Sequence, residues 1–498
     1  MKIQFSSQAS SLSDDKVNVL LVDSTISLQG YSNIERDLLL KISSNARITK
    51  HFSGKTKQSL FFIIDGKKIL LIGTDDTHRK NMARSSKFCL YSQIGSTITN
   101  RINALKEEKI AFHMPDFMKE DETTSIILGM QLKNYSFSKY FINKLQEHTN
   151  SFIECAVHSE LHAILQKHFD EHYHHLVNGV FLTRDLVNEP ANVLSPEEFI
   201  NVVQDKCSSI NGLTIKVLKE NEMRALKMNA LLGVAQGSSR ESRLLVMEWN
   251  GGSNTNIGLV GKGVTFDSGG ISIKPSQNMG DMKGDMGGAA TVIGTMYSVA
   301  KRNAKINVVA VIPLVENMPS GTAQRPGDVV SSMSGQTIEI DNTDAEGRLI
   351  LADALWYLQE NYHNITRIID LATLTGAITI ALGDIYAGLF CNNDELAQNL
   401  ISAGYETGEL LWRLPIASEY DEQINSTIAD MKNVGSGRGA GSTTAAQFLY
   451  RFIKDKDYSW AHIDIAGVSM SKHPAHFGTS GGTGFGVLLL DKFIRKYE

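Results

Sequence analysis

Short apolar runs separated by turn signals mark the first third of the chain. Val17–Asp23 has the length and apolar character of a buried strand. Ser59–Gly73 holds two apolar runs on either side of Asp65-Gly66, a pattern that predicts a β-hairpin. Thr124–Phe141 has helical periodicity. This alternation predicts a small N-terminal α/β domain, and it contains no Gly-rich phosphate loop.

A long helical pattern follows, from about His158 to Asn188, and ends where Pro190 and Pro196 interrupt it. Ser195 and Pro196 are the residue types favoured at the N-cap and first position of another helix. We expect the long helix to connect two domains. The predicted divisions are an N-terminal domain at 1–157, the connecting helix at 158–188 and a C-terminal domain at 189–498.

Beyond the connecting helix, long apolar strands alternate with amphipathic helices. Strand-like runs include "IGLVGKGVTFD", "INVVAVIPLV", "RIIDLATL" and "WAHIDIAG". Such a pattern predicts a mixed, mostly parallel sheet covered by helices. The expected fold class is therefore α/β, with a small N-terminal domain joined by a long helix to a larger C-terminal one. Ligand sites in such sheets form at strand ends and in the loops that follow.

Composition narrows the class of protein. A chain of 498 residues is too long to fold around one ordinary hydrophobic core, so more than one domain is expected. Its formal charge of -5 argues against an overall positive electrostatic potential of the kind that attracts nucleic acid. The start has no apolar core of signal-peptide length, and no stretch approaches the roughly 20 apolar residues of a membrane span. We expect a cytoplasmic protein. Its widely separated cysteines should be free thiols: Cys89, Cys155, Cys207 and Cys391.

One concentration of charge, "NTDAEGRL", places Asp344, Glu346 and Arg348 at alternate positions. In an extended backbone these side chains point the same way. Two carboxylates that close repel each other unless a cation or a proton lies between them. The alternative is a solvated loop before a helix, with Asp344 or Glu346 as its N-cap or dipole partner.

A second concentration lies in the Gly-rich segment Gly261–Ala290. Lys262 and Asp267 flank the end of one strand-like run, Lys274 ends another, and Asp285 opens a helix. Each alone fits an ordinary turn, surface or N-cap role, but four in an otherwise apolar segment favour a site. The start "GLVGKG" lacks the spacer and the Ser/Thr of a phosphate loop, so nucleotide binding is a weak alternative.

The residue types restrict the chemistry of these segments. No histidine occurs between His175 and His363, so a metal bound here would have nearly all oxygen ligands, which suit Mg or Mn and are acceptable to Zn. Four carboxylates exceed the charge of one divalent ion, and two neighbouring ions account for the surplus. The pattern predicts a two-metal hydrolase and leaves peptide and phosphate ester substrates both open.

Five motifs carry a resemblance to a known family: "VGKGVTFDSGGISIK", "MKGDMGGAA", "NTDAEGRL", "LATLTGA" and "WAHIDIAG". They resemble the leucine (cytosol) aminopeptidase family of dimetal exopeptidases, and the likeness extends from about residue 188 to the C-terminus. The resemblance implies that the C-terminal domain is catalytic and that the protein is a hydrolase, a leucyl aminopeptidase. The N-terminal domain matches only in general layout.

The resemblance also implies a role for each charged residue named above in the two segments. Asp267 and Glu346 would bridge the two metals, Lys262 and Asp285 would complete the tighter site, and Asp344 the more exchangeable one. Lys262 as a ligand requires a neutral amine, and therefore a strongly lowered pKa beside two cations.

Further implied roles concern the substrate. Lys274 would stabilise the oxyanion that develops on the peptide carbonyl, and Arg348 would hold a bicarbonate ion as general base on the bridging water. The free α-amine of the substrate would bind one metal. A methionine wall suits leucine-like side chains. Residues that match the family's site for the N-terminal residue are Met282, Thr373, Leu374 and Gly376.

The family implies partners as well. The metals would be two divalent ions per subunit, Mn or Zn, with Mg possible. Members of the family are typically homohexamers built as two trimers that act on peptides. Some bacterial members bind DNA as regulators, which leaves a DNA-binding role as the alternative function, although the weakly acidic charge does not favour it.

Overall fold

The computed structural model describes residues 1–7, 12–23, 31, 33–75, 87–143, 152–252, 256–437, 439–454, 458–472 and 478–498. It divides into two units, one formed mainly by residues 1–177 and the other by most of residues 178–498. None of the described helices combines the length and apolar character that a membrane crossing requires. The four cysteines are buried free thiols, as predicted.

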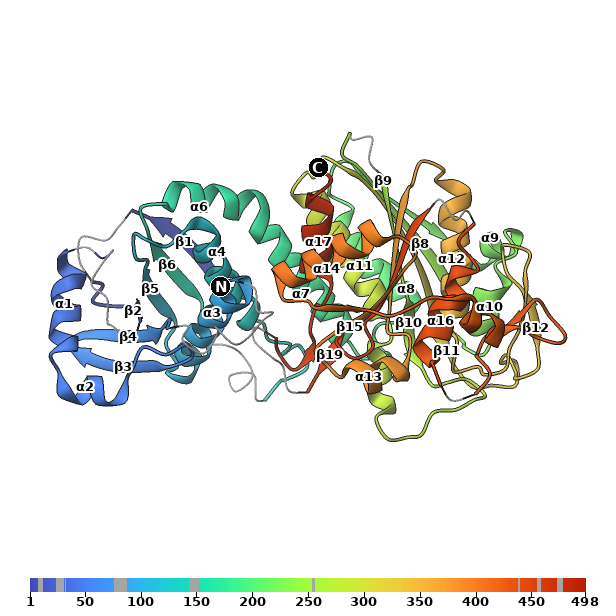
Figure 1. The fold of residues 1–498 in the computed structure, drawn as a ribbon, viewed down its shortest axis with the longest axis horizontal. Coiled ribbons are helices and arrows are strands. Elements are labelled where there is room, and N and C mark those ends of the chain that lie inside the picture. Colours follow the sequence, from blue (N-terminus) through green and yellow to red (C-terminus); the bar gives the residue numbers. More distant parts are fainter. Residues whose placement is uncertain are drawn as a thin grey trace. The chain divides into compact units, whose positions relative to one another are not determined.

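The first unit is built on a six-stranded sheet in the order β1-β6-β5-β2-β4-β3 (Figure 1). All its pairs are parallel except β3 and β4, which form the predicted hairpin around Asp65-Gly66. Both turn residues have positive φ, as a tight hairpin turn requires. The strands are β1 Lys2–Ser6, β2 Val17–Val22, β3 Ser59–Ile64, β4 Lys67–Gly73, β5 Lys109–His113 and β6 Glu154–His158. The helices are α1 Asn33–Ser43, α2 Ala46–His51, α3 Lys87–Ala104 and α4 Glu120–Lys133.

Two predicted helices have different bounds. The helix predicted for Thr124–Phe141 is α4, which begins earlier and ends at Lys133, where Asn134 donates a side-chain hydrogen bond to the Phe152 carbonyl. The long helix begins at His162 rather than His158, because His158 pairs with β5 in the sheet. It continues as α6 His162–His168, a π-helical turn η2 Phe169–Tyr173 and α7 His174–Asn188.

The second unit contains a nine-stranded sheet with parallel pairs at its centre, where β18, β14, β9 and β11 lie side by side. Antiparallel pairs, β15 with β18 and β8 with β11, lie on either side of that centre. This is the mixed, mostly parallel sheet that the sequence predicts. Its strands are β7 Leu213–Leu218, β8 Arg243–Asn250, β9 Asn256–Gly261, β10 Gly263–Asp267, β11 Asn307–Asn317, β14 Arg367–Ala372, β15 Ala387–Cys391, β16 Leu411–Arg413 and β18 Ser459–Asp464.

Helices cover both faces of this sheet (Figure 1). Alternate residues of a strand enter different hydrophobic clusters: Leu245 and Met247 of β8 enter one, Leu244 and Val246 the other. One cluster contains residues of α8 Pro196–Cys207, α11 Gly287–Lys301, α14 Asp394–Thr407 and α17 Val487–Arg495. The other contains residues of α10 Asn229–Ala235, α12 Gly347–Asn361 and α16 Gly441–Tyr450. Ser195 caps α8 as predicted, accepting the Glu198 N–H.

A buried carboxyl group makes the stability of this unit depend on pH. Glu409 is buried and accepts the backbone N–H of Leu489 in α17 at 2.7 Å, and burial raises its pKa to about 8. A carboxyl whose folded-state pKa is raised stabilises the fold below its ordinary pKa and loses that contribution as the pH rises through about 8. We expect the Tm difference between wild type and Glu409→Gln to shrink or reverse in favour of the variant between pH 5 and pH 9.

Thermal unfolding at several pH values measures this difference. Glu395→Gln changes an exposed glutamate of α14 and serves as the control, with the pH profile of the wild type. Parallel profiles for wild type and Glu409→Gln would contradict the prediction.

Candidate active site

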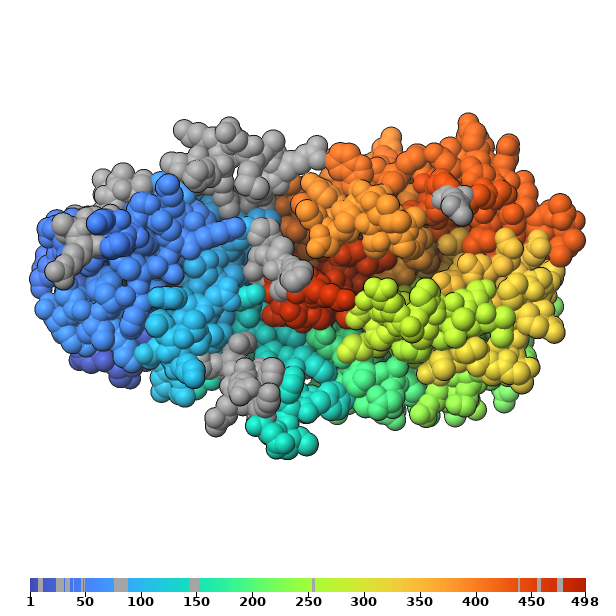
Figure 2. All heavy atoms as spheres, turned by 90° about the horizontal axis from the view of Figure 1, so that it is seen from below, coloured from blue at the N-terminus to red at the C-terminus, as the bar shows by residue number. Residues whose placement is uncertain are grey.

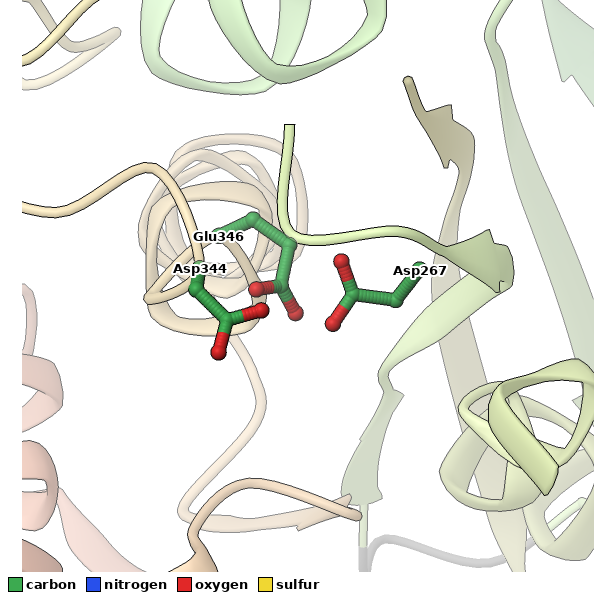
Figure 3. Close-up of side chains that lie close together, drawn as sticks. All are labelled: Asp267, Asp344 and Glu346. Atoms are coloured by element: carbon green, nitrogen blue, oxygen red, sulfur yellow. The ribbon is translucent and has the colours of Figure 1, made fainter. Parts of the chain in front are cut away.

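Three carboxylates from two distant segments converge at strand and helix ends. Asp267 is the last residue of β10, whereas Asp344 and Glu346 stand just before α12. Figure 3 shows their carboxylates turned toward one another, and each offers an oxygen within 4.8 Å of the others'. Residues 344–348 do not form the extended segment in which alternate side chains share one face. Glu346 stands at the N-cap of α12, as in the alternative of a loop before a helix, but its side chain makes no capping hydrogen bond, and Arg348 lies in the first turn.

Two lysines complete the cluster. The Nζ of Lys262 lies 2.8 Å from Asp285 Oδ2 and 2.8 Å from Glu346 Oε1. The Nζ of Lys274 lies 2.7 Å from Asp267 Oδ2 and also contacts Asp344. Of the seven charged residues predicted for the site, all except Arg348 are therefore joined by ion pairs or lie within a few ångströms of one another.

The backbone that presents these side chains differs from the predicted strands. The run "IGLVGKGVTFD" breaks into β9 and β10 at Lys262, whose N–H donates to the Leu371 carbonyl and whose carbonyl accepts the Ala289 N–H. The segment that ends at Lys274 is a loop, not a strand, since Gly269 and Gly270 have positive φ. The helix expected to open at Asp285 is α11, which begins at Gly287 after the 3₁₀ turn η3 Met279–Gly284.

A glycine gives Lys262 its room. A Cβ on Gly347 would lie 2.6–2.8 Å from the last atoms of the Lys262 side chain. Any larger residue at the start of α12 would therefore displace the lysine from Asp285 and Glu346. Gly347, one of the two small residues of "NTDAEGRL", is thus a steric requirement of the site.

Hydrogen bonds fix the orientation of the carboxylates. Asp267 Oδ1 accepts the Asn317 side-chain amide at 2.8 Å and the Gly269 N–H at 2.9 Å. Asp285 Oδ1 accepts the Thr373 hydroxyl at 2.7 Å. Asp267 and Asp285 are thus held by neutral donors as well as by the lysines.

Burial and neighbouring charges set the pKa values. Burial acts to lower the pKa of Lys262, but Asp285, Glu346 and Asp267 outweigh it and raise that pKa above its ordinary value. Burial and the charge of Glu346 raise the pKa of Asp267 to about 6, against the two lysines. Burial also opposes ionisation of Glu346, yet Lys262 and Lys274 hold its pKa below the ordinary value. In this arrangement the positive charges of the two lysines offset part of the negative charge of the carboxylates.

The donor set fits divalent cations. Carboxylate oxygens are the ligands that Mg and Mn prefer and that Zn accepts. The Oε2 atom of Glu346 is buried without a hydrogen-bond partner in the part of the chain that the structure describes. An unpaired carboxylate oxygen beside two other carboxylates is a ready cation ligand.

Arg348 occupies a different environment. Its guanidinium is buried, one terminal nitrogen donates to the Asn433 carbonyl at 2.8 Å, and Nε has no acceptor among the described residues. Burial lowers its pKa to about 10, although Glu346 and Asp464 favour the charged form. Arg348 is not among the described residues that line the cavity at the cluster.

A cavity of about 780 Å³ opens at the cluster. It is lined by all four residues predicted to bind the N-terminal residue of the substrate: Met282, Thr373, Leu374 and Gly376. Several further lining residues were not among those predicted for the site, although Ala466 lies in the motif "WAHIDIAG". Ala466, Ser469 and Met470 come from the chain after β18. Figure 2 shows the face on which the yellow-green segment near residue 280 adjoins the red C-terminal segment.

Comparison with known proteins gives matches that agree on one family. Residues 181–490 match the profile of the cytosol aminopeptidase family, catalytic domain. A probable cytosol aminopeptidase of Bradyrhizobium sp. is 49% identical over 435 residues, covering 86% of this chain and 84% of its own. Another, of Nitrobacter winogradskyi, is 46% identical over 463 residues, covering 91% and 90%.

Solved structures agree. A tomato leucine aminopeptidase mutant superposes with a TM-score of 0.85 at 30% identity, covering 100% of this chain and 96% of that one. The bottromycin maturation enzyme BotP in complex with Mn gives a TM-score of 0.83 at 28% identity, covering 97% and 100%.

The two-unit α/β fold and these matches define the protein as a hydrolase, an aminopeptidase. The chain belongs to the cytosol aminopeptidase family.

Proposed function

We propose that the protein is a metal-dependent aminopeptidase that releases N-terminal amino acids, preferably leucine-like, from peptides. The observation that carries the proposal is the cluster of carboxylates and lysines at the cavity that Met282 and Leu374 also line. The comparisons support the aminopeptidase class, and the cluster supports the chemistry.

Five residues would hold two divalent ions. Asp267 and Glu346 would bind both ions, Lys262 and Asp285 would complete one site, and Asp344 the other. When bound, the ions would polarise the peptide carbonyl and make a water nucleophilic near neutral pH. The carboxylate geometry and the buried, unpaired Glu346 Oε2 support this assignment.

Two residues would act on the reacting groups. Lys274 has its side chain about one-fifth exposed, so it can donate to a carbonyl oxygen that gains negative charge. Arg348 would hold bicarbonate as the general base, and its unpaired Nε supports an anion-binding role. Lys274 and Arg348 thus serve catalysis rather than metal binding.

The cavity would select the substrate. Met282 and Leu374 give it apolar, adaptable contacts suited to leucine, and Thr373 and Gly376 supply small surfaces beside them. A hydrogen bond joins Thr373 to Asp285, so this wall of the cavity is connected to a proposed metal ligand.

Other features complete the proposal. Mn is one candidate metal, supported by the Mn complex of the related BotP; Zn is the other, with Mg possible. We propose a cytoplasmic homohexamer, in keeping with relatives named cytosol aminopeptidases. Residues 189–498 would form the catalytic domain, joined to 1–157 by 158–188. The formal charge of -5 gives the alternative DNA-binding role no support.

Blocking the substrate's amine tests the exopeptidase activity. A neutral amine can donate its lone pair to a metal, whereas an acetylated nitrogen is a poor donor and adds bulk. We expect N-acetyl-Leu-Gly to be hydrolysed at least about tenfold more slowly than Leu-Gly, because the amine also aligns the carbonyl. Rates are compared at equal peptide concentration with Mn or Zn supplied.

Two comparisons complete this experiment. Chelation followed by return of Mn or Zn should remove and restore the hydrolysis of Leu-Gly. Comparable cleavage of the acetylated peptide would contradict the proposed function, since the enzyme would then not require a free N-terminus.

A further inference from the structure

Asp464, the last residue of β18, is a fully buried carboxylate outside the cluster. Its Oδ1 accepts the N–H groups of Leu374 at 3.1 Å and Ala466 at 3.2 Å. Its Oδ2 accepts the Thr375 hydroxyl at 2.6 Å. One carboxylate therefore satisfies three donors.

All three donors line the cavity, whereas Asp464 itself does not. Leu374 and Thr375 follow β14, and Ala466 follows β18, the neighbouring parallel strand. Asp464 thus ties together two separate segments of the cavity wall from behind.

The same wall has a second anchor. The Thr373 carbonyl accepts a hydrogen bond from Lys262 Nζ at 2.8 Å, and the Thr373 hydroxyl donates to Asp285 at 2.7 Å. Residues 373–376 are consequently held at one end by the charged cluster and at the other by Asp464. The distance between the side-chain wall and the cluster depends on both anchors.

Thr375 transmits this constraint into the next helix. Its hydroxyl oxygen accepts the Ile378 N–H at 3.2 Å as the N-cap of α13 Gly376–Leu382, and it lies 3.0 Å from the Ser442 hydroxyl. The hydroxyl that donates to Asp464 therefore also fixes where α13 begins.

We propose that Asp464 is a positioning residue that determines selectivity for the N-terminal side chain, by holding Leu374, Thr375 and Ala466 in place as the cavity wall. The inference rests on the proposed function, since it requires that this wall contacts the substrate's first residue. If the wall can shift away from the cluster, it contacts the side chain of an N-terminal leucine poorly. A substrate with N-terminal alanine loses little binding energy, because its small side chain contacts the wall less.

The test compares Leu-Gly with Ala-Gly as substrates of the complete protein. Asp464→Ala should raise KM for Leu-Gly about five- to tenfold and reduce the ratio of kcat/KM for Leu-Gly over Ala-Gly by a similar factor, with a smaller change in kcat. Asp353→Ala is the matched control. Asp353 is equally buried and accepts the backbone N–H groups of Leu231 and Met333, but it does not line the cavity. This control should lower Tm and keep the wild-type ratio.

A milder variant covers the case in which Asp464→Ala fails to fold. Thr375→Val keeps the shape of the side chain and replaces its hydroxyl with a methyl group. It removes the contact with Asp464 together with the N-cap of α13, and it should lower the same ratio. Because Asp464 and Thr375 share one of the three contacts of Asp464, the double variant should lose less selectivity than the product of the single losses.

The outcomes separate the inference from the proposed function. A wild-type enzyme without preference for Leu-Gly over Ala-Gly contradicts the proposed function and removes the basis of the inference. A wild-type preference that survives in both Asp464→Ala and Thr375→Val overturns the inference alone. A ratio that falls equally in Asp353→Ala also overturns it, because the loss would then reflect general destabilisation.

Discussion

Glu346→Gln should nearly abolish turnover while the protein stays folded. Glu346 is the proposed ligand of both ions, and its loss of charge weakens both sites at once. Bound divalent ions supply several kcal/mol of transition-state stabilisation, so the expected fall in kcat/KM is on the order of 10³ or more. The fold should persist because Lys262 keeps its ion pair with Asp285.

The measurement is the hydrolysis of Leu-Gly at saturating Mn or Zn, with Tm recorded in parallel. Glu409→Gln is the matched control, because it makes the same change at a buried glutamate that does not line the cavity. Activity of Glu346→Gln within tenfold of the wild type would refute the proposed ligand set.

Lys274→Ala should lower kcat far more than it changes KM. Lys274 is proposed to stabilise the oxyanion, which exists only in the transition state. Removal of such a donor costs on the order of 10²–10³ in rate. The variant also frees Asp267 and Asp344 from their ion pairs with the lysine. Metal binding should therefore not weaken, and kcat must be measured at saturating metal.

Lys454→Ala is the control for this substitution. It also breaks a lysine–carboxylate ion pair, with Glu360 at 2.6 Å, and Lys454 does not line the cavity. A pure rise in KM for Lys274→Ala would assign the residue to substrate binding. Wild-type kcat would remove it from the mechanism.

The sequence predicts the sheet class because apolar runs such as that of β11 are long and regular. It fails where distant residues decide the backbone. The pattern continues through Lys262, but β9 ends before it and β10 begins after it: the Lys262 N–H donates to the Leu371 carbonyl beside β9, whereas the Lys262 carbonyl accepts the N–H of Ala289 in α11. These partners are far away in the sequence, and no local pattern encodes them.

In the candidate site, too, the sequence predicts the residue types but not the backbone that brings them together. One interpretation of "NTDAEGRL" puts its charged side chains on one face of an extended segment, yet Asp344 and Glu346 converge with Asp267 from a turn and a helix start. Residue types and motifs were sufficient to select these side chains. Asp464 lies in the motif "WAHIDIAG", but that motif does not reveal its role, since its partners Leu374 and Thr375 become neighbours only when β14 and β18 pair.

The two lysines within the carboxylate cluster have a consequence for the newly synthesised chain. Lys262 and Lys274 together contact Asp267, Asp285, Asp344 and Glu346, so the nascent protein neutralises much of its own buried charge. Four unpartnered carboxylates would repel one another and oppose collapse of the core around them. We therefore expect the two lysines to favour folding, because each buried carboxylate finds a positively charged partner within the chain itself.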